Sequence, residues 1–289
     1  MSERGAARLA GVVMLAALAA CDSAEADTGA QRMRSTTVAR QLQGESRASV
    51  EVRYGAGRLR VSPARGDLLY RMELRYDDAH FRPLSEYDRA AGRIRLGTES
   101  REQGGGMGGG HDDQHATIEL SPRLPIALRL SFGAGEADVA LGGLALEDVH
   151  VQTGASSSRV TFDAPNRVDA KRVRVEAGAA ELRVSGLGNT RSPRFEFSGG
   201  VGETTLEFGG AWTRSATAQV NLGVGSVRLR LPRSLGVKIV RDSFLSSFDA
   251  GGMVKRENAW YSRNYEQAPH KLDISIKAAV GSVEVNWID

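Results

Sequence analysis

A cluster of polar side chains in the first half of the sequence has the composition of a metal site. His111, Asp112, Asp113 and His115 directly follow the glycine-rich run GGGMGGG. Imidazole and carboxylate groups suit Zn, Ni or Cu. A glycine-rich frame does not hold ligands in place, so a solvated loop between two strands is the alternative. We therefore expect no metal, and we keep His111, Asp113 and His115 as the candidate ligands if one binds.

Catalytic motifs are missing from the sequence. None of the five histidines stands beside a serine or cysteine in a nucleophile motif. There is no Gly-x-Ser-x-Gly elbow, phosphate-binding loop or His-Glu-x-x-His zinc motif. Acidic residues are scattered, whereas glycan cleavage on a β-sheet needs clustered carboxylates. The sequence therefore predicts a protein that is not an enzyme and has no cofactor.

Arginines recur in stretches where apolar and polar residues alternate. Alternation with period two is typical of a strand with one buried face, so these arginines should share the outer face. They could form a ladder that attracts anionic lipid or an acidic envelope polymer. The alternative is a face that charge keeps soluble. The outward residues include Arg58, Arg60, Arg129, Arg159, Arg174, Arg183, Arg228 and Arg230.

Three aromatic residues are further binding candidates. Trp212 lies in a polar connector, where it could be a ligand platform or could pack against an edge of the fold. Trp260 and Tyr261 lie in an aromatic-rich stretch at 244–263. That stretch could cover the end of the fold, or it could contact a partner or a glycan.

Seven similar stretches must position these residues. Each is an alternating apolar run, a corner of small residues and a second alternating run. The corner glycines Gly133, Gly154, Gly178, Gly200 and Gly223 recur at steps of about 21–24 residues, a length typical of one solenoid turn. We therefore expect an all-β, single-stack β-solenoid with Gly-x-Gly corners. The stretches are 50–61, 128–141, 149–162, 173–184, 195–208, 218–231 and 274–287.

The start of the sequence has the features of a lipoprotein leader. Arg4 and Arg8 precede a short apolar run at 9–20, which ends in the sequence LAAC at Cys21. This ending is similar to a bacterial lipobox, which implies a signal peptide over 1–20, cleavage before Cys21 and acyl chains that anchor the chain to a membrane. A plain secretory signal followed by an accidental cysteine is the alternative. With lipid on Cys21, the polar residues 21–47 would form a flexible tether between the membrane and the folded domain.

The order of several motifs resembles one known family, the toast-rack domain. The corner GAGRLRV begins at Gly55, and the strand GDLLYRMELRY ends at Tyr76. They are followed by Arg82-Pro83, by Leu124-Pro125 and by the GGL sequence that begins at Gly142. The toast-rack domain has no known molecular function and is related to the extracytoplasmic parts of LiaF-like cell-wall stress regulators. The resemblance covers about 50–240 and implies a single-stack solenoid with no catalytic residues.

Together these features predict a lipid-anchored protein of the bacterial cell envelope, facing the periplasm or the exterior. Its solenoid would span 48–289, with insertions at 62–120 and 243–270, and would act as an interaction module. The expected partners are the membrane, through lipid on Cys21, and an envelope protein, anionic lipid or glycan. A solenoid that binds or cleaves a glycan, or a LiaF-like cell-envelope stress regulator, is the alternative. The formal charge of +3 does not indicate nucleic acid.

Overall fold

The computed structural model describes residues 32–101 and 113–289, except for the side chains of 243–246. Strands and one short 3-10 helix, η1 (Leu187–Thr190), are the regular structure of these residues. None of their helical structure has the length and hydrophobicity that a membrane crossing requires. The strands are β1 (Met33–Gln41), β2 (Ala48–Pro63), β3 (Leu68–Asp77), β4 (Phe81–Asp88), β5 (Arg93–Ser100), β6 (His115–Leu120), β7 (Pro125–Ala140), β8 (Ala145–Thr161), β9 (Val173–Ser185), β10 (Arg194–Glu207), β11 (Ala216–Pro232), β12 (Gly236–Asp249), β13 (Val254–Arg256), β14 (Ala259–Tyr261) and β15 (Lys271–Ile288).

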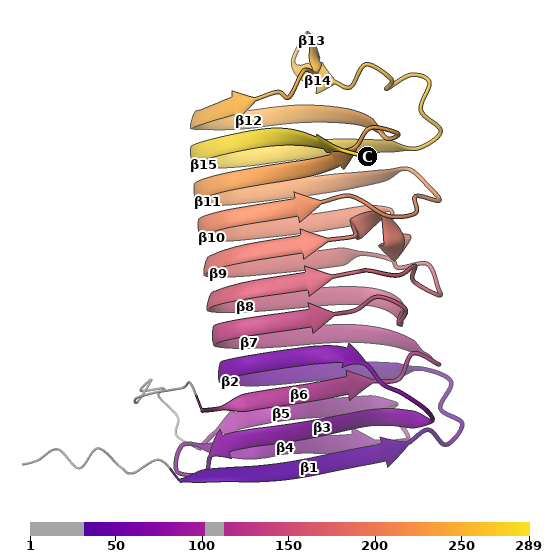
Figure 1. Ribbon diagram of the computed structural model, residues 1–289, viewed down its shortest axis with the longest axis vertical. Coiled ribbons are helices and arrows are strands. Elements are labelled where there is room, and N and C mark those ends of the chain that lie inside the picture. Colours follow the sequence, from indigo (N-terminus) through magenta and orange to yellow (C-terminus); the bar gives the residue numbers. More distant parts are fainter. Residues whose placement is uncertain (1–31, 102–112) are drawn as a thin grey trace, which may run out of the picture. The chain divides into compact units, whose positions relative to one another are not determined.

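All of these strands belong to one sheet. Their order is β1-β3-β6-β2-β7-β8-β9-β10-β11-β15-β12-β14-β13, with β5 beside β2 and β4 beside β5. From β2 to β12 the long strands run parallel to one another. Figure 1 shows that each long strand doubles back at one side, so the sheet is folded into two layers. We call the layer of the first strand halves layer 1 and that of the second halves layer 2.

The core lies between the two layers, and β7 shows how the sequence creates it. Before the corner, the alternate residues Leu128, Leu130 and Phe132 are buried. After the corner, Ala137 and Val139 are buried. The interval from 132 to 137 is odd, so the alternation changes phase at the corner. Both halves of the strand therefore turn their apolar side chains toward the same interior.

Neighbouring strands pair at nearly constant offsets in sequence. Phe132 of β7 pairs with Thr153 of β8, and Val151 of β8 pairs with Val175 of β9. The offsets from β9 to β10 and from β10 to β11 fall between these two. Corners therefore stack on corners: a Cβ added to Gly154 would overlap the carbonyl oxygen of Gly133. Only glycine permits this close approach of two backbones.

At the N-terminal end, the sheet continues through strands of mixed direction. β5 pairs in parallel with the first half of β2, and β6 pairs in parallel with its second half. β4 then pairs antiparallel with β5, and β3 pairs antiparallel with β6. The described parts of the predicted insertion 62–120, which are 62–101 and 113–120, thus contribute strands β3, β4, β5 and β6 to the sheet. β1 pairs antiparallel with β3, from Met33 opposite Asp77 to Gln41 opposite Leu68. The tether predicted over 21–47 is therefore wrong for 33–41, because β1 is polar and exposed but gains order from the backbone ladder of β3.

At the C-terminal end, the order of strands in the sheet departs from their order in the chain. β15 lies between β11 and β12, parallel to both. β12 extends to Asp249, so the insertion predicted to begin at residue 243 is wrong at its start. β12 is not evident from the sequence, because its bend, at 243–246, reads SFLS and contains no glycine corner. The hairpin of β13 and β14 then pairs antiparallel with β12.

Candidate functional site

A groove of about 680 Å³ crosses the outer surface of layer 2 over β6, β2, β7, β8 and β9. Its volume is in the range of ordinary ligand sites. Its lining carries both signs of charge: four arginines lie among Glu136, Asp138 and Glu181, and His115 stands at one edge. The arginines are Arg58, Arg60, Arg159 and Arg183. We call this surface the layer 2 groove.

The register of the strands puts the lining residues in two rows. Arg58, Glu136, Ser157 and Glu181 are successive partners in the first row. In the second row, Arg60 and Asp138 are followed by Arg159 and Arg183. Each residue stands one or three positions after the glycine corner or its equivalent, so alternation turns all of them outward. Because neighbouring strands lie about 4.8 Å apart, the rows present charged groups at short, regular intervals.

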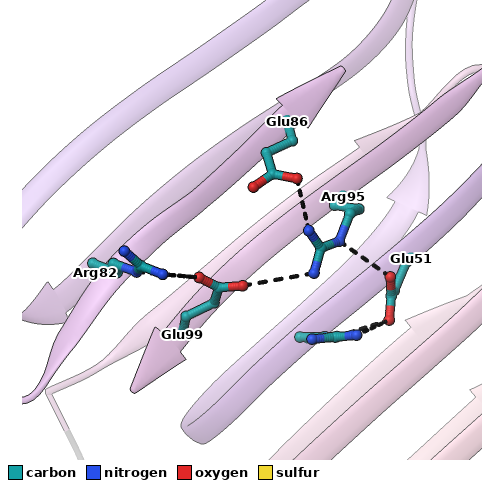
Figure 2. A network of polar contacts seen from close by, with 6 residues as sticks. Glu51, Arg82, Glu86, Arg95 and Glu99 are labelled. Atoms are coloured by element: carbon teal, nitrogen blue, oxygen red, sulfur yellow. Dashed lines mark hydrogen bonds and ion pairs between the residues drawn. The ribbon is translucent and has the colours of Figure 1, made fainter. Parts of the chain in front are cut away.

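Most arginines elsewhere on the strands have ion-pair partners. The best-connected is Arg95 of β5, shown in Figure 2, whose guanidinium contacts Glu86 at 2.7 Å and Glu51 at 3.3 Å. A third contact, at 3.7 Å, joins Arg95 to Glu99, which also pairs with Arg82. These groups come from β2, β4 and β5, so the network joins three strands at the N-terminal end of layer 1.

The groove differs from that pattern. Arg60, Arg159 and Arg183 are exposed, and none of them forms an ion pair or hydrogen bond with another residue that the structure describes. Asp138 stands directly between Arg60 and Arg159 in register, yet it does not pair with either one. Guanidinium groups without internal partners keep all their donors available for a phosphate or carboxylate. The layer 2 groove therefore has the chemistry of a site for anionic groups.

The arginine ladder expected from the sequence is divided in the structure. Arg58 and Arg60 lie together in the groove, but Arg228 and Arg230 lie on β11, beyond β10 and outside the groove lining. Arg228 pairs with Glu284 at 3.1 Å, and Arg230 pairs with Glu207 at 2.6 Å. Their charges are therefore compensated within the fold. Alternation gave the outward direction of all four residues, but it could not give the acidic residue opposite each one.

Trp212 is a packing residue in the structure. It is partly buried against the core, and its indole Nε1 donates a hydrogen bond to the carbonyl oxygen of Phe208 at 2.7 Å. Its ring meets the edge of Phe195, with ring centroids 6.2 Å apart. Since the polar atom and part of the ring are already engaged, this geometry favours the packing alternative over a ligand platform.

Trp260 and Tyr261 lie on β14, where they are also engaged internally. Trp260 packs on Phe248 with centroids 5.4 Å apart, and the Lys255 ammonium lies 5.8 Å from the Trp260 ring. Lys238 and Arg256 lie 5.9 and 5.5 Å from the Tyr261 ring, at the distance of cation–π contacts. β14 pairs with β12, the outermost long strand in the order of the sheet, so this geometry favours the prediction of a cover over that end.

The other site predictions fall mostly outside the described residues. Cys21, His111 and Asp112 are not described, and Asp113 and His115 are exposed. Within residues 32–101 and 113–289, no three His, Cys, Asp or Glu side chains are placed to hold a metal ion. That no metal binds, and that Cys21 is lipidated, both stay predictions. The acidic members of the groove were not singled out from the sequence, although their fixed distance from the corner could have located them.

The Arg95 network leads to a prediction about acid stability. Burial acts to raise the pKa of Glu51, but its hydrogen bonds and charge interactions with Arg53 and Arg95 outweigh this and lower the pKa. A carboxyl whose pKa is lower in the folded than in the unfolded state stabilises the fold fully above its unfolded pKa of about 4.3. It loses this contribution as the pH falls through the folded pKa. We expect the free energy of unfolding to decrease between about pH 5 and pH 3, by less in the Glu51→Gln variant than in the parent. Urea titrations at both values measure this. Equal decreases in the two proteins would contradict it.

Comparisons with known proteins identify one family. The family model of the N-terminal domain of toast_rack, DUF2154, matches residues 28–185, which includes every strand of the layer 2 groove. No curated protein matches the chain.

Solved structures resemble the chain at low identity. One is a "putative cell adhesion protein" from Clostridium sporogenes, which is 16% identical over 89% of this chain and 100% of its own, with a TM-score of 0.47. Another is a "putative adhesin" from Bacteroides fragilis, which is 14% identical over 87% of this chain and 97% of its own, with a TM-score of 0.41. Similarity at this level carries no argument about function. The family match over 28–185 covers more than half of the sequence, and the chain therefore belongs to the toast-rack family.

Proposed function

We propose that this chain is a lipid-anchored protein of the bacterial cell envelope, and that its sheet binds anionic envelope material in the layer 2 groove without catalysing a reaction. The observation that carries the proposal is a set of three guanidinium groups in one groove, those of Arg60, Arg159 and Arg183. None of them has an ion-pair partner among the residues that the structure describes. On the same strands Arg53 and Arg174 are ion-paired. What sets the three groove arginines apart is that they line a single concave surface.

The groove suits a ligand that carries both anionic and hydroxyl groups. Each arginine can make two parallel hydrogen bonds to a phosphate or carboxylate. The groove also contains three carboxylates, from Glu136, Asp138 and Glu181. They can accept hydrogen bonds from the hydroxyl groups of a ligand, and they repel an anionic ligand that has no hydroxyl groups. A lipid headgroup such as phosphatidylglycerol has this chemistry, and so does an acidic polysaccharide. Among the described groups that line the groove, no set converges as a nucleophile, base and oxyanion site would, which supports binding without turnover.

The remaining parts of the proposal come from the sequence pattern. Acyl chains on Cys21 would hold the domain at a membrane, with the groove available to material at that surface. The nearly constant pairing offsets between neighbouring strands support a single-stack β-solenoid, in which each long strand with its connector is one turn. Such a stack is a rigid support for groups that must stay in a fixed array.

A charge-matched pair of variants tests the groove. We expect Arg60→Gln, Arg159→Gln and Arg183→Gln together to weaken binding at least about tenfold, or about 1.4 kcal/mol. The matched control replaces Arg93, Arg129 and Arg194, which are also exposed and form no ion pair with a described residue, but which point outward from layer 1. It removes the same charge and should change binding less than about twofold, because long-range attraction between exposed charges is screened by salt.

The measurement uses the full mature chain with Cys21→Ser, so that acyl chains do not contribute to binding. Co-sedimentation with phosphatidylcholine vesicles, with and without phosphatidylglycerol, reports headgroup binding. Titration with polygalacturonate reports binding of an acidic polysaccharide. Binding to one probe only identifies the source of the anionic group. If both triple variants bind as the parent does, or if the parent binds neither probe, the groove does not have this function.

A further inference from the structure

The C-terminal strand β15 occupies a slot between two strands that are neighbours in the sequence. β11 ends at Pro232 and β12 begins at Gly236, so only the short connector 233–235 joins them. β15 nevertheless lies between them and pairs in parallel with both, from Ala216 opposite Leu272 on one side and from Gly236 opposite Lys271 on the other. The chain therefore completes β12 and the β13–β14 hairpin first, and it returns to the slot with its last strand (Figure 1).

The two walls of the slot are already in register with each other. Val220 of β11 pairs with Ile276 of β15, which pairs with Arg241 of β12. The separation of Val220 and Arg241 in the sequence equals that of Phe132 and Thr153, which pair directly on β7 and β8. The step from β11 to β12 thus has the length of one ordinary turn. β15 is an additional level in the stack, and the short connector from β11 to β12 bridges it.

β15 matches its slot through a pattern of side chains and shares part of the sequence of its neighbour. Val280–Val283 repeats the VGSV sequence of Val224–Val227, and the two segments lie opposite each other residue by residue. Inside the stack, Leu272, Ile276 and Val283 are at most 1% exposed. Loss of this burial is expensive, so β15 must be held in a slot of this kind whenever the domain is folded.

We propose that β15 is an exchangeable strand, and that the C-terminal strand of a second copy of this chain can fill the slot between β11 and β12. Exchange would preserve every pairing of β15 and would alter only the segment 262–270 between β14 and β15, which is why such swaps cost little. When extended, this segment can span about 30 Å, enough to reach an adjacent copy. The partner is a second copy because β15 itself has the length, register and glycine position that the slot requires.

Engineered disulfides distinguish a strand held by its own chain from an exchanged one. Ser226 and Ser282 are paired partners on β11 and β15, and both point outward on layer 2. Cysteines at these two positions should be close enough to bond. The control places cysteines at Ser157 and Glu181, which are paired partners on β8 and β9 and would not exchange. Both variants carry Cys21→Ser in the full mature chain.

The proteins are unfolded, refolded over a range of concentrations, oxidised, and separated by size before non-reducing electrophoresis. We expect a dimer whose share rises about tenfold for a tenfold rise in concentration while monomers dominate. Within this dimer, the 226–282 disulfide should join two chains, whereas the 157–181 disulfide should stay within one chain. A second pair, at Gln219 and Ser275 in layer 1, repeats the test if the first variant does not fold. Absence of a dimer at every concentration, or a dimer whose 226–282 disulfide stays within one chain, would overturn the proposal.

Discussion

Replacement of Phe208 by alanine is expected to lower the free energy of unfolding by about 3–5 kcal/mol. The Phe208 side chain is fully buried in the middle of the stack. Its ring meets Phe195 and Phe197 edge to face, with centroid distances of 5.7 and 6.3 Å. The flanking strands are fixed by their ladders on both sides, so the structure can collapse only partly into the cavity, and the cavity term is added to the lost transfer energy.

Chemical denaturation followed by circular dichroism measures this effect. The matched control is Val201→Ala, because Val201 is apolar but 58% exposed at the corner of β10. A substitution there should change the free energy of unfolding by less than about 0.5 kcal/mol. Similar losses in the two variants would show that the aromatic cluster does not hold the middle of the stack together.

The second large effect is expected at a glycine corner. Gly281 of β15 has a φ of 144°, a backbone conformation that residues other than glycine rarely adopt. A Cβ at this position would also overlap the carbonyl oxygen of Gly225 on β11. Gly281→Ala should therefore destabilise the domain by about 2–6 kcal/mol, because backbone strain and steric overlap each contribute about 1–3 kcal/mol.

Gly66 separates the two causes. Its φ is 68°, but an added Cβ meets nothing within 4 Å. Gly66→Ala should therefore cost only the backbone term, about 1–2 kcal/mol. Thermal unfolding of both variants beside the parent measures the difference. A Gly281→Ala variant no less stable than Gly66→Ala would mean that the stacked corners can separate without cost.

Strand content and the location of most strands could be predicted from the sequence, because both depend on local patterns. Alternation places Leu128, Leu130 and Phe132 on one face of β7, whatever the neighbouring strands are. The spacing of the corner glycines equals the offsets at which their strands pair. The same alternation gave the outward direction of the groove arginines, which are Arg58, Arg60, Arg159 and Arg183.

The errors arose where order comes from a partner strand. β1 has one apolar residue against the core, Val38, and it is a strand because β3 offers a free edge. β12 has no glycine at its corner and is held by the ladder of β15. A local pattern contains no information about such a neighbour, so the sequence predicts 33–41 as part of a tether and 243–249 as part of an insertion.

The sequence by itself determined the all-β class and the buried face of each alternating strand, because backbone geometry ties both to residue types at short range. The order of its motifs indicated the family. Only the tertiary structure decided which charges are compensated. Arg230 is paired because Glu207 stands on the neighbouring strand, whereas Arg60 and Arg159 have no ion-pair partner among the described residues on either side of Asp138. Only the tertiary structure placed β15 between β11 and β12. Pairing between distant strands depends on which edges remain free after the others have formed, and alternation within a strand does not encode that.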